Sequence, residues 1–163
     1  MLRDQMYYNL QLPTDRLTRD VVSPLRVSLR DSIEKKQAIE TLATYASREL
    51  QWDLVPFNAD ENEVQDDFVP WTAYLFHGEF MPPYDLDDHY KNVLYFGACC
   101  FREQENEDGV YRWELNWVWL HPYFRRRGWL TRAWPLFKQE FGSFEVSTPQ
   151  EEAMKSFLLK NPD

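Results

Sequence analysis

Apolar residues recur along the chain with two different periods, which separate predicted strands from predicted helices. Residues 25–29 alternate apolar and polar positions, the pattern of a strand with one buried face. Residues 93–101 form a nearly continuous apolar run, which predicts a strand buried on both faces. Strands are predicted over residues 25–29, 71–77, 93–101, 110–120 and 144–147.

Spacings of three and four between apolar residues predict the helices. The first has a continuous apolar stripe, and Asp31 followed by Glu34 resembles a capping box at its start. Gly142 is well placed to end the second helix, and Pro149 to begin the third. Helices are predicted over residues 32–51, 130–141 and 149–160.

Three stretches have no clear period. Residues 53–70 carry acidic runs and predict a solvated loop or a short helix, while an acidic rim facing a substrate is the functional alternative. Residues 78–92 form an insertion whose role stays open. Residues 1–24 are treated as an unassigned N-terminal arm that packs on the domain or on a second copy of the chain.

Length and charge bound the class of protein. A chain of 163 residues is the size of one domain, so residues 25–163 are predicted to form a single domain. The net charge of −9 makes nucleic acid an unlikely partner and is compatible with a cationic amine substrate. The sequence has no apolar stretch typical of a signal peptide or a membrane span, so we expect no membrane partner and a cytoplasmic location.

The two cysteines, Cys99 and Cys100, are adjacent. Neighbours on a strand point to opposite faces, so a disulfide between them is not expected, and adjacency is a poor spacing for metal ligands. We expect reduced thiols in the core and no metal site.

A basic turn separates the strand over 110–120 from the helix over 130–141. A strand that runs into a helix start leaves several backbone N–H groups without intrahelical partners, and such groups attract anions. Gly128 lets the backbone approach a ligand closely, and the three arginines at 125–127 add positive charge. The pattern favours a phosphate-binding turn over a merely solubilising one.

The residues of this turn resemble the acyl-coenzyme A signature of the GNAT (Gcn5-related) N-acetyltransferases. Leu120-His-Pro122 matches the Val-x-Pro strand end, and Arg125-x-x-Gly128-x-Leu130 matches Gln/Arg-x-x-Gly-x-Gly/Ala, with Leu130 in place of the last small residue. The resemblance covers roughly residues 90–160. It implies an α/β (α+β) fold with a GNAT-like mixed, mostly antiparallel central sheet flanked by helices, C-terminally short because two further strands are usual.

The resemblance also implies how acetyl-CoA would bind as the acyl donor. The pantetheine arm is expected between the strand over 110–120 and the strand at 144–147, bonded to the backbone of Val118, Trp119 and Leu120. The N–H of Leu120 is expected to stabilise the oxyanion. The pyrophosphate is expected on the turn formed by Arg125, Arg126, Arg127, Gly128, Trp129 and Leu130.

Glu114 is the candidate general base that the resemblance implies, since it lies six positions before Leu120, where histone-acetylating members carry a glutamate. We expect both residues on the same strand face. A carboxylate is useful there because a lysine-like amine is almost wholly protonated at neutral pH. A glutamate that is solvated or paired with Arg112 is the alternative, and His121 is a second candidate base.

The general acid is harder to find. Many family members use a tyrosine on the last helix, and the matching position here is Phe157, which cannot donate a proton. Ser147, Thr148 or Tyr123 would then substitute, or the thiolate would leave unassisted.

Two functions follow from the resemblance. The first is an acyl-CoA-dependent N-acyltransferase that moves an acetyl group from acetyl-CoA to a primary amine by direct attack in a ternary complex. The alternative is a catalytically weak or inactive GNAT-like module that binds coenzyme A, regulates, or contacts another protein. The acceptor, an amine-bearing small molecule or protein, is not identified by the sequence. A homodimer would cover an unpaired sheet edge.

Overall fold

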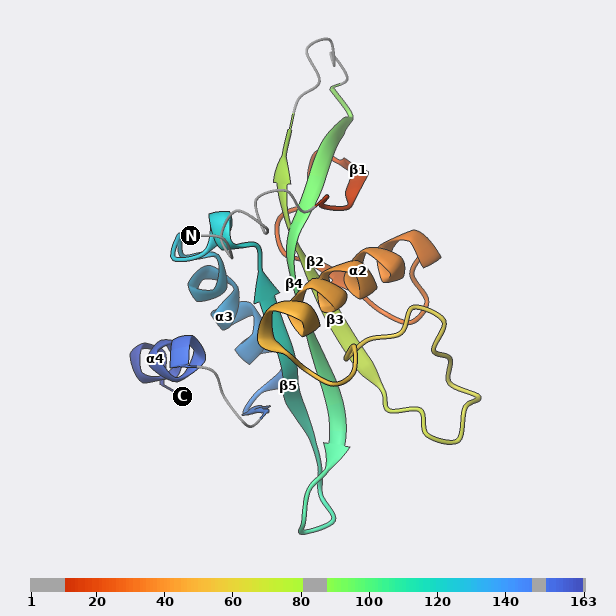
Figure 1. Ribbon diagram of the computed structural model, residues 1–163, viewed down its shortest axis with the longest axis vertical. Helices are drawn as coiled ribbons and strands as arrows, with labels where there is room; N and C mark the ends of the chain where they lie inside the picture. Colours follow the sequence, from red (N-terminus) through yellow and green to blue (C-terminus); the bar gives the residue numbers. More distant parts are fainter. Residues whose placement is uncertain (1–10, 81–87, 148–151, 163) are drawn as a thin grey trace.

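The computed structural model describes residues 11–80, 88–147 and 152–162, which are arranged around one twisted sheet (Figure 1). The strands are β1 (Thr14–Thr18), β2 (Leu25–Val27), β3 (Trp71–Glu79), β4 (Tyr90–Glu105), β5 (Tyr111–Leu120) and β6 (Glu145–Val146). The helices are α2 (Ile33–Leu50), the 3-10 helix η1 (Pro122–Phe124), α3 (Trp129–Phe141) and α4 (Glu152–Lys160).

The sheet has the strand order β2-β3-β4-β5-β6. Neighbouring strands are antiparallel except β5 and β6, which are parallel. β1 pairs with the first residues of β4, beyond the Leu120 end of β5. The predicted fold class, a mixed and mostly antiparallel sheet flanked by helices, is confirmed.

Each face of the sheet carries its own core. On one face α2 contributes Ile39 and Leu42, which pack in the same cluster as Trp117 and Trp119 of β5. On the other face, α3 packs against the sheet and forms a second cluster of buried side chains. Apolar side chains of α4 pack against this second cluster. The sheet therefore separates α2 from α3 and α4, and any contact between α2 and the start of α3 has to pass around the end of β5.

A bulge in β5 decides which side chains face which helix. Cys100 pairs with Trp117 and Phe101 pairs with Leu115, so Asn116 has no partner in β4. Leu115 packs in the core on the α3 face, whereas Trp117, two residues later, packs on the α2 face. An inserted residue reverses the alternation of side chains along a strand, which explains this switch.

The structure places part of the segment that the sequence left unassigned. Residues 14–18 form strand β1, which pairs with β4, so this part of the N-terminal arm packs on the domain, one of the two alternatives. This short strand has a single apolar residue, Leu17, which is buried. One apolar position cannot show the alternating pattern by which a strand is predicted. Residues 1–10 lie outside the described residues.

The N-cap of α2 is Ser32, and the expectation that Asp31 caps the helix is wrong. The side chain of Ser32 accepts a hydrogen bond from the N–H of Lys35, which makes Ser32 the N-cap. The Asp31 carboxylate instead accepts from the N–H of Ser28 at 2.7 Å, so it closes the preceding turn. The helix itself, Ile33–Leu50, agrees with the predicted range.

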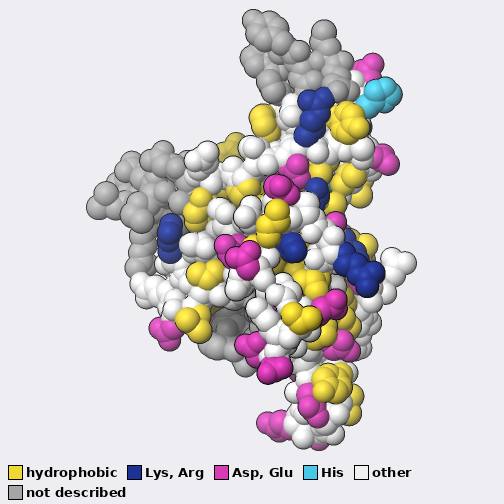
Figure 2. Space-filling model, turned by 90° about the vertical axis from the view of Figure 1, so that its right-hand side faces the viewer, with side chains coloured by type: hydrophobic (Ala, Val, Ile, Leu, Met, Phe, Trp, Pro, Cys, Tyr) yellow, Lys and Arg dark blue, Asp and Glu magenta, His cyan; other side chains and the backbone are white. Residues whose placement is uncertain are grey.

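The acidic stretch 53–70 is a loop, as one of the two structural alternatives predicted. Phe57 and Ala59 are buried, and the guanidinium of Arg102 contacts Glu61 at 3.3 Å, so the loop is fastened over the α2 face. On the face drawn in Figure 2, acidic side chains lie intermixed with basic and apolar ones. The interspersed charges give no support to a continuous acidic rim on that face.

Within residues 11–80, 88–147 and 152–162, no helix is both long and apolar enough to cross a membrane. The same residues contain no group of three or more His, Cys, Asp or Glu side chains arranged to hold a metal ion.

Candidate active site

The turn between β5 and α3 has an unusual backbone. Arg125 is extended, Arg126 has a φ of 61°, and Gly128 is the N-cap of α3 with a φ of 81°. Glycine adopts the left-handed region without steric cost, which explains Gly128, while Arg126 adopts it as an ordinary residue at some cost. The stacking of Phe124 on Phe96, with ring centroids 4.0 Å apart, fixes the preceding 3-10 helix on the sheet.

A run of backbone N–H groups at this turn has no acceptor among the described residues. Gly128 provides no side-chain cap, and the first intrahelical bond runs from the N–H of Arg132 to the carbonyl of Gly128 at 3.0 Å. From Arg126 to Thr131, no backbone N–H donates to any residue in the described part of the chain. Consecutive free amides at a helix N-terminus attract anions, and the helix dipole adds to this attraction.

Exposed arginines surround these amides. Arg126 and Arg127 are exposed, and the guanidinium of Arg127 lies 4.4 Å from the ring centroid of Tyr123. Arg132, which lies outside the recognised signature, folds back so that its Nη1 donates to the carbonyl of Arg127 at 3.0 Å. A Cβ at Gly128 would lie 2.9 Å from that Nη1 atom. Gly128 therefore also provides the space in which Arg132 lies.

Arg125 is placed differently from the other arginines. Its Nη2 contacts the two carboxylate oxygens of Glu49 at 2.8 Å and 2.6 Å, and its Nε donates to the carbonyl of Leu120 at 2.8 Å. Its guanidinium is thus already bonded within the protein. Arg126 and Arg127 are thus exposed at the turn, whereas Arg125 points back to α2.

The outer edge of β5 is only briefly paired. β6 matches Glu114 and Leu115, and the N–H of Ser147 donates to the carbonyl of Leu115 at 3.0 Å. Beyond this point, no strand in the described residues pairs with the outer edge of β5. Residues 116–120 therefore form an open strand edge, with no partner strand on this side among the described residues.

The direction of the backbone groups along this edge follows from one hydrogen bond. The N–H of His121 donates to the carbonyl of Phe96 in β4 at 2.7 Å. Because directions alternate along a strand, Trp119 also faces β4, whereas Val118 and Leu120 direct their N–H groups to the open edge. The backbone N–H of Trp119 therefore does not face the open edge. The indole of Trp119 donates a hydrogen bond to Glu49 at 2.9 Å.

Trp129 and Leu130 contribute amides rather than side chains. The Leu130 side chain packs against the core on the α3 face, and its N–H belongs to the run that has no acceptor among the described residues. Trp129 also packs there, with its ring 4.9 Å from that of Phe96. The departure from the family signature at Leu130 is accommodated by the core.

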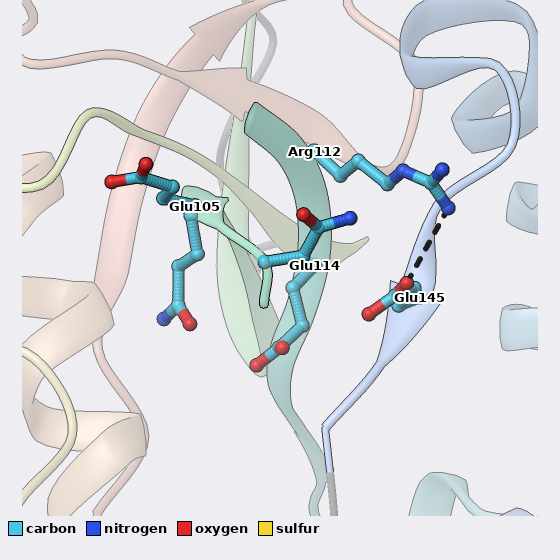
Figure 3. A pocket seen from close by; sticks show the side chains of 6 residues that line it. Glu105, Arg112, Glu114 and Glu145 are labelled. Carbon is cyan, nitrogen blue, oxygen red and sulfur yellow. Dashed lines mark ion pairs between the residues drawn. The ribbon is translucent and has the colours of Figure 1, made fainter. Parts of the chain in front are cut away.

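Glu114 lies at the other end of β5 (Figure 3). It lines a small cavity of about 40 Å³ at the β4–β5 hairpin, together with Glu105, Arg112 and Glu145. Arg112 contacts Glu145 at 3.7 Å, not Glu114 as one alternative proposed. The bulge at Asn116 places Glu114 on the α2 side of the sheet, whereas Leu120 packs on the α3 side. The expectation that both residues share one face is wrong.

The remaining candidates have structural contacts. His121 is buried and its Nδ1 accepts a hydrogen bond from the N–H of Tyr123 at 3.1 Å, which caps η1. Phe157 is half-buried and packs edge-on against Trp134 with ring centroids 4.8 Å apart, so its side chain lies against the core on the α3 face. Thr148 lies outside the described residues.

Comparison with known proteins gives a similarity in structure. No family model matches the sequence, and no curated protein matches it. The chain is similar to a solved structure described as ribosomal-protein-alanine N-acetyltransferase from Brucella melitensis biovar Abortus 2308, with 15% sequence identity and a TM-score of 0.44. The similarity covers 90% of this chain and 89% of that one. At this identity and TM-score it does not assign an activity.

Proposed function

We propose that this protein is an acyl-CoA-dependent N-acyltransferase that moves an acetyl group from acetyl-CoA to a primary amine. The observation that carries the proposal is the run of free N–H groups from Arg126 to Thr131, flanked by exposed arginines and adjacent to the open edge of β5. A pyrophosphate is a doubly charged group with many acceptor oxygens, so it fits such a turn.

The order of groups along β5 determines where the rest of acetyl-CoA would lie. Leu120 is next to the turn, so its N–H is reached first by the pantetheine arm. The arm contains two amides between pyrophosphate and sulfur, so the thioester lies further along the strand than Leu120, and the N–H of Val118 is the next one that faces the open edge. We therefore assign the oxyanion donor to the N–H of Val118 in place of Leu120, and Leu120 to the arm.

Glu114 remains the proposed general base. It lies four residues before Val118, or about 13 Å along a strand, so it would take the proton of the amine through water rather than directly. The acetyl group passes from sulfur to the amine nitrogen, the carbonyl carbon–nitrogen bond forms, and the carbon–sulfur bond breaks. The second proton of the attacking nitrogen passes to solvent, and the thiolate leaves without a general acid at Phe157, which has no hydroxyl, and takes its proton from solvent.

A binding module without catalysis is the second candidate. Two observations favour it: the Phe157 side chain packs against the core, and Glu114 is on the sheet face opposite Leu120. In this case acetyl-CoA or coenzyme A would bind at the turn without turnover.

Calorimetric titration of acetyl-CoA tests the proposal. The wild type is compared with an Arg126→Glu, Arg127→Glu double variant, which reverses charge at the turn. An Arg30→Glu, Lys160→Glu double variant is the control, since both residues are exposed elsewhere and the change in net charge is equal. We expect the turn variant to bind at least about tenfold more weakly and the control to bind as the wild type does.

Absence of binding to the folded wild type would refute both candidates. Binding without acetylation of any amine in a broad library would leave the binding module.

A further inference from the structure

The contact between Glu49 and Arg125 links two elements that the sheet otherwise keeps apart. Glu49 is in the last turn of α2, and Arg125 follows η1, on the way to α3. Because α2 and α3 pack on opposite faces of the sheet, the α2 core does not hold the turn. The ion pair supplies a direct connection between them.

The position of Glu49 is not favourable for the helix itself. A carboxylate in the last turn faces the negative end of the helix dipole. Its side chain is only 16% exposed, against 38% for Arg125, so it is also partly removed from water. Such a carboxylate requires partners, and it has them in Arg125 Nη2 at 2.6 Å and 2.8 Å and in the Trp119 indole at 2.9 Å.

The other end of the Arg125 side chain reaches the site. Its Nε donates to the carbonyl of Leu120 at 2.8 Å, at the point where β5 ends. The Arg125 backbone directly precedes Arg126, whose φ of 61° begins the run of free amides. One side chain thus joins α2, the last residue of the open edge and the first residue of the anion-binding turn.

We infer that Glu49 is a positioning residue for the acyl-CoA site, and that it acts through Arg125. This inference rests on the proposed function. Glu49 neutralises and orients the Arg125 guanidinium, which then fixes the turn instead of contacting phosphate. The anion is bound by the amides and by Arg126, Arg127 and Arg132.

Acetyl-CoA titration of Glu49→Gln tests the positioning role. Glutamine keeps an acceptor for the Trp119 indole but removes the charge that holds Arg125. Because a preorganised turn binds without paying for ordering, we expect affinity to fall about tenfold. Glu140→Gln is the matched control, since it removes the ion pair of Arg26 with the far end of α3 at 3.0 Å. Wild-type affinity in Glu49→Gln would overturn the inference.

The salt dependence of binding separates positioning from direct contact. Charge contacts with a ligand weaken as salt is added, so losing one lowers the dependence of affinity on salt. We expect Arg125→Gln to weaken binding with the wild-type salt dependence, and Arg126→Gln to reduce that dependence. An equal reduction in both variants would show that Arg125 contacts the phosphate and would overturn the inference.

A measurement without ligand keeps this test independent of the proposed function. Backbone chemical shifts report the left-handed conformation of Arg126 in the free protein. We expect this signature to be lost or averaged in Glu49→Gln and retained in Glu140→Gln. Its retention in Glu49→Gln would refute positioning even if acetyl-CoA binds. Its loss, with no binding to the wild type, would refute the proposed function alone.

Discussion

The two ends of β5 carry the two halves of the candidate site, and they are built differently. At the Leu120 end, the candidate site is mainly backbone: the amides from Arg126 to Thr131, flanked by arginine side chains, and an open strand edge. At the Glu114 end, it consists of a side chain, the Glu114 carboxylate, which lines a small cavity beside Glu105 and Glu145. The first end depends on a few local torsion angles, and the second on which face of the sheet each residue occupies.

This difference separates binding from chemistry. Changes in the turn should alter the affinity for acetyl-CoA, because they alter the donors that we propose hold it. Changes near Glu114 should alter the rate of transfer and leave affinity unchanged. The predictions that follow test this separation.

The largest effect is expected for Glu114→Gln. If Glu114 removes the proton of the amine, kcat should fall about 10²- to 10⁴-fold, because a positioned base contributes that much, while the Kd for acetyl-CoA stays unchanged. Steady-state kinetics with an accepted amine, together with calorimetry, measure both quantities. Glu105→Gln, which lies in the same cavity, is the control and should retain kcat. An unchanged kcat in Glu114→Gln would remove Glu114 from the mechanism.

Gly128→Ala should weaken acetyl-CoA binding by about tenfold, because a left-handed alanine costs about 1–2 kcal/mol and the added Cβ displaces Arg132. Gly142→Ala is the control, since Gly142 has a φ of 65° at the other end of α3. Both variants should lose stability in denaturant unfolding, but calorimetry should show lost affinity in Gly128→Ala alone. Equal affinity losses would mean that the effect comes from α3 as a whole.

The same contrast explains what the sequence could predict. The turn was found because its signals are local: Pro122, Gly128 and the apolar stripe of the following helix lie within a few residues of one another. The face of Glu114 was predicted wrongly, because the bulge at Asn116 depends on pairing with β4. Strict alternation of side chains between the two faces holds only for a regular strand. No residue type near Asn116 indicates a bulge in the sequence.

The roles of the arginines show a second limit. Three consecutive arginines look equivalent in the sequence, yet Arg125 is committed to Glu49, a residue 76 positions away in the chain. Arg132 lies outside the signature and joins the site because α3 brings it back over Gly128. Its position one helical turn after Gly128 was the signal that could have indicated it.

Arg132→Gln should weaken acetyl-CoA binding by roughly two- to fivefold, which corresponds to about 0.3–1 kcal/mol for one charge at a helix N-terminus. Calorimetry at low salt measures the difference, which should shrink as salt is added. Lys160→Gln, an exposed cation on α4, is the control. A loss that is insensitive to salt would point to altered packing on Trp129 rather than to a lost charge contact.

The stability of the whole fold should itself depend on pH, and this must be measured before a pH effect on binding or rate is interpreted. Burial lowers the pKa of His77 below its usual 6.5, and nearby Lys91 lowers it further, while a backbone contact at Val22 opposes them. The unfolded chain therefore binds this proton more readily than the folded one, so the free energy of unfolding should fall as the pH drops below about 6.5. Denaturant unfolding from pH 8 to pH 5 measures this, and His77→Gln should flatten the profile. An unchanged profile in that variant would assign the acid sensitivity to other groups.

The smallest effect is expected from thiol reagents. Cys99 and Cys100 are fully buried, and burial raises the pKa of the Cys100 thiol to about 12 and that of Cys99 well above its usual value. A thiol of this kind is not a nucleophile at neutral pH, so no acetyl group should be transferred to it. Mass spectrometry after incubation with acetyl-CoA should show no acetylated cysteine, and a thiol-reactive dye should label the protein only after denaturation. Labelling of the folded protein would show that the sheet opens at β4, which lies between β3 and β5. An acetylated cysteine would contradict direct attack and indicate a two-step transfer through the enzyme.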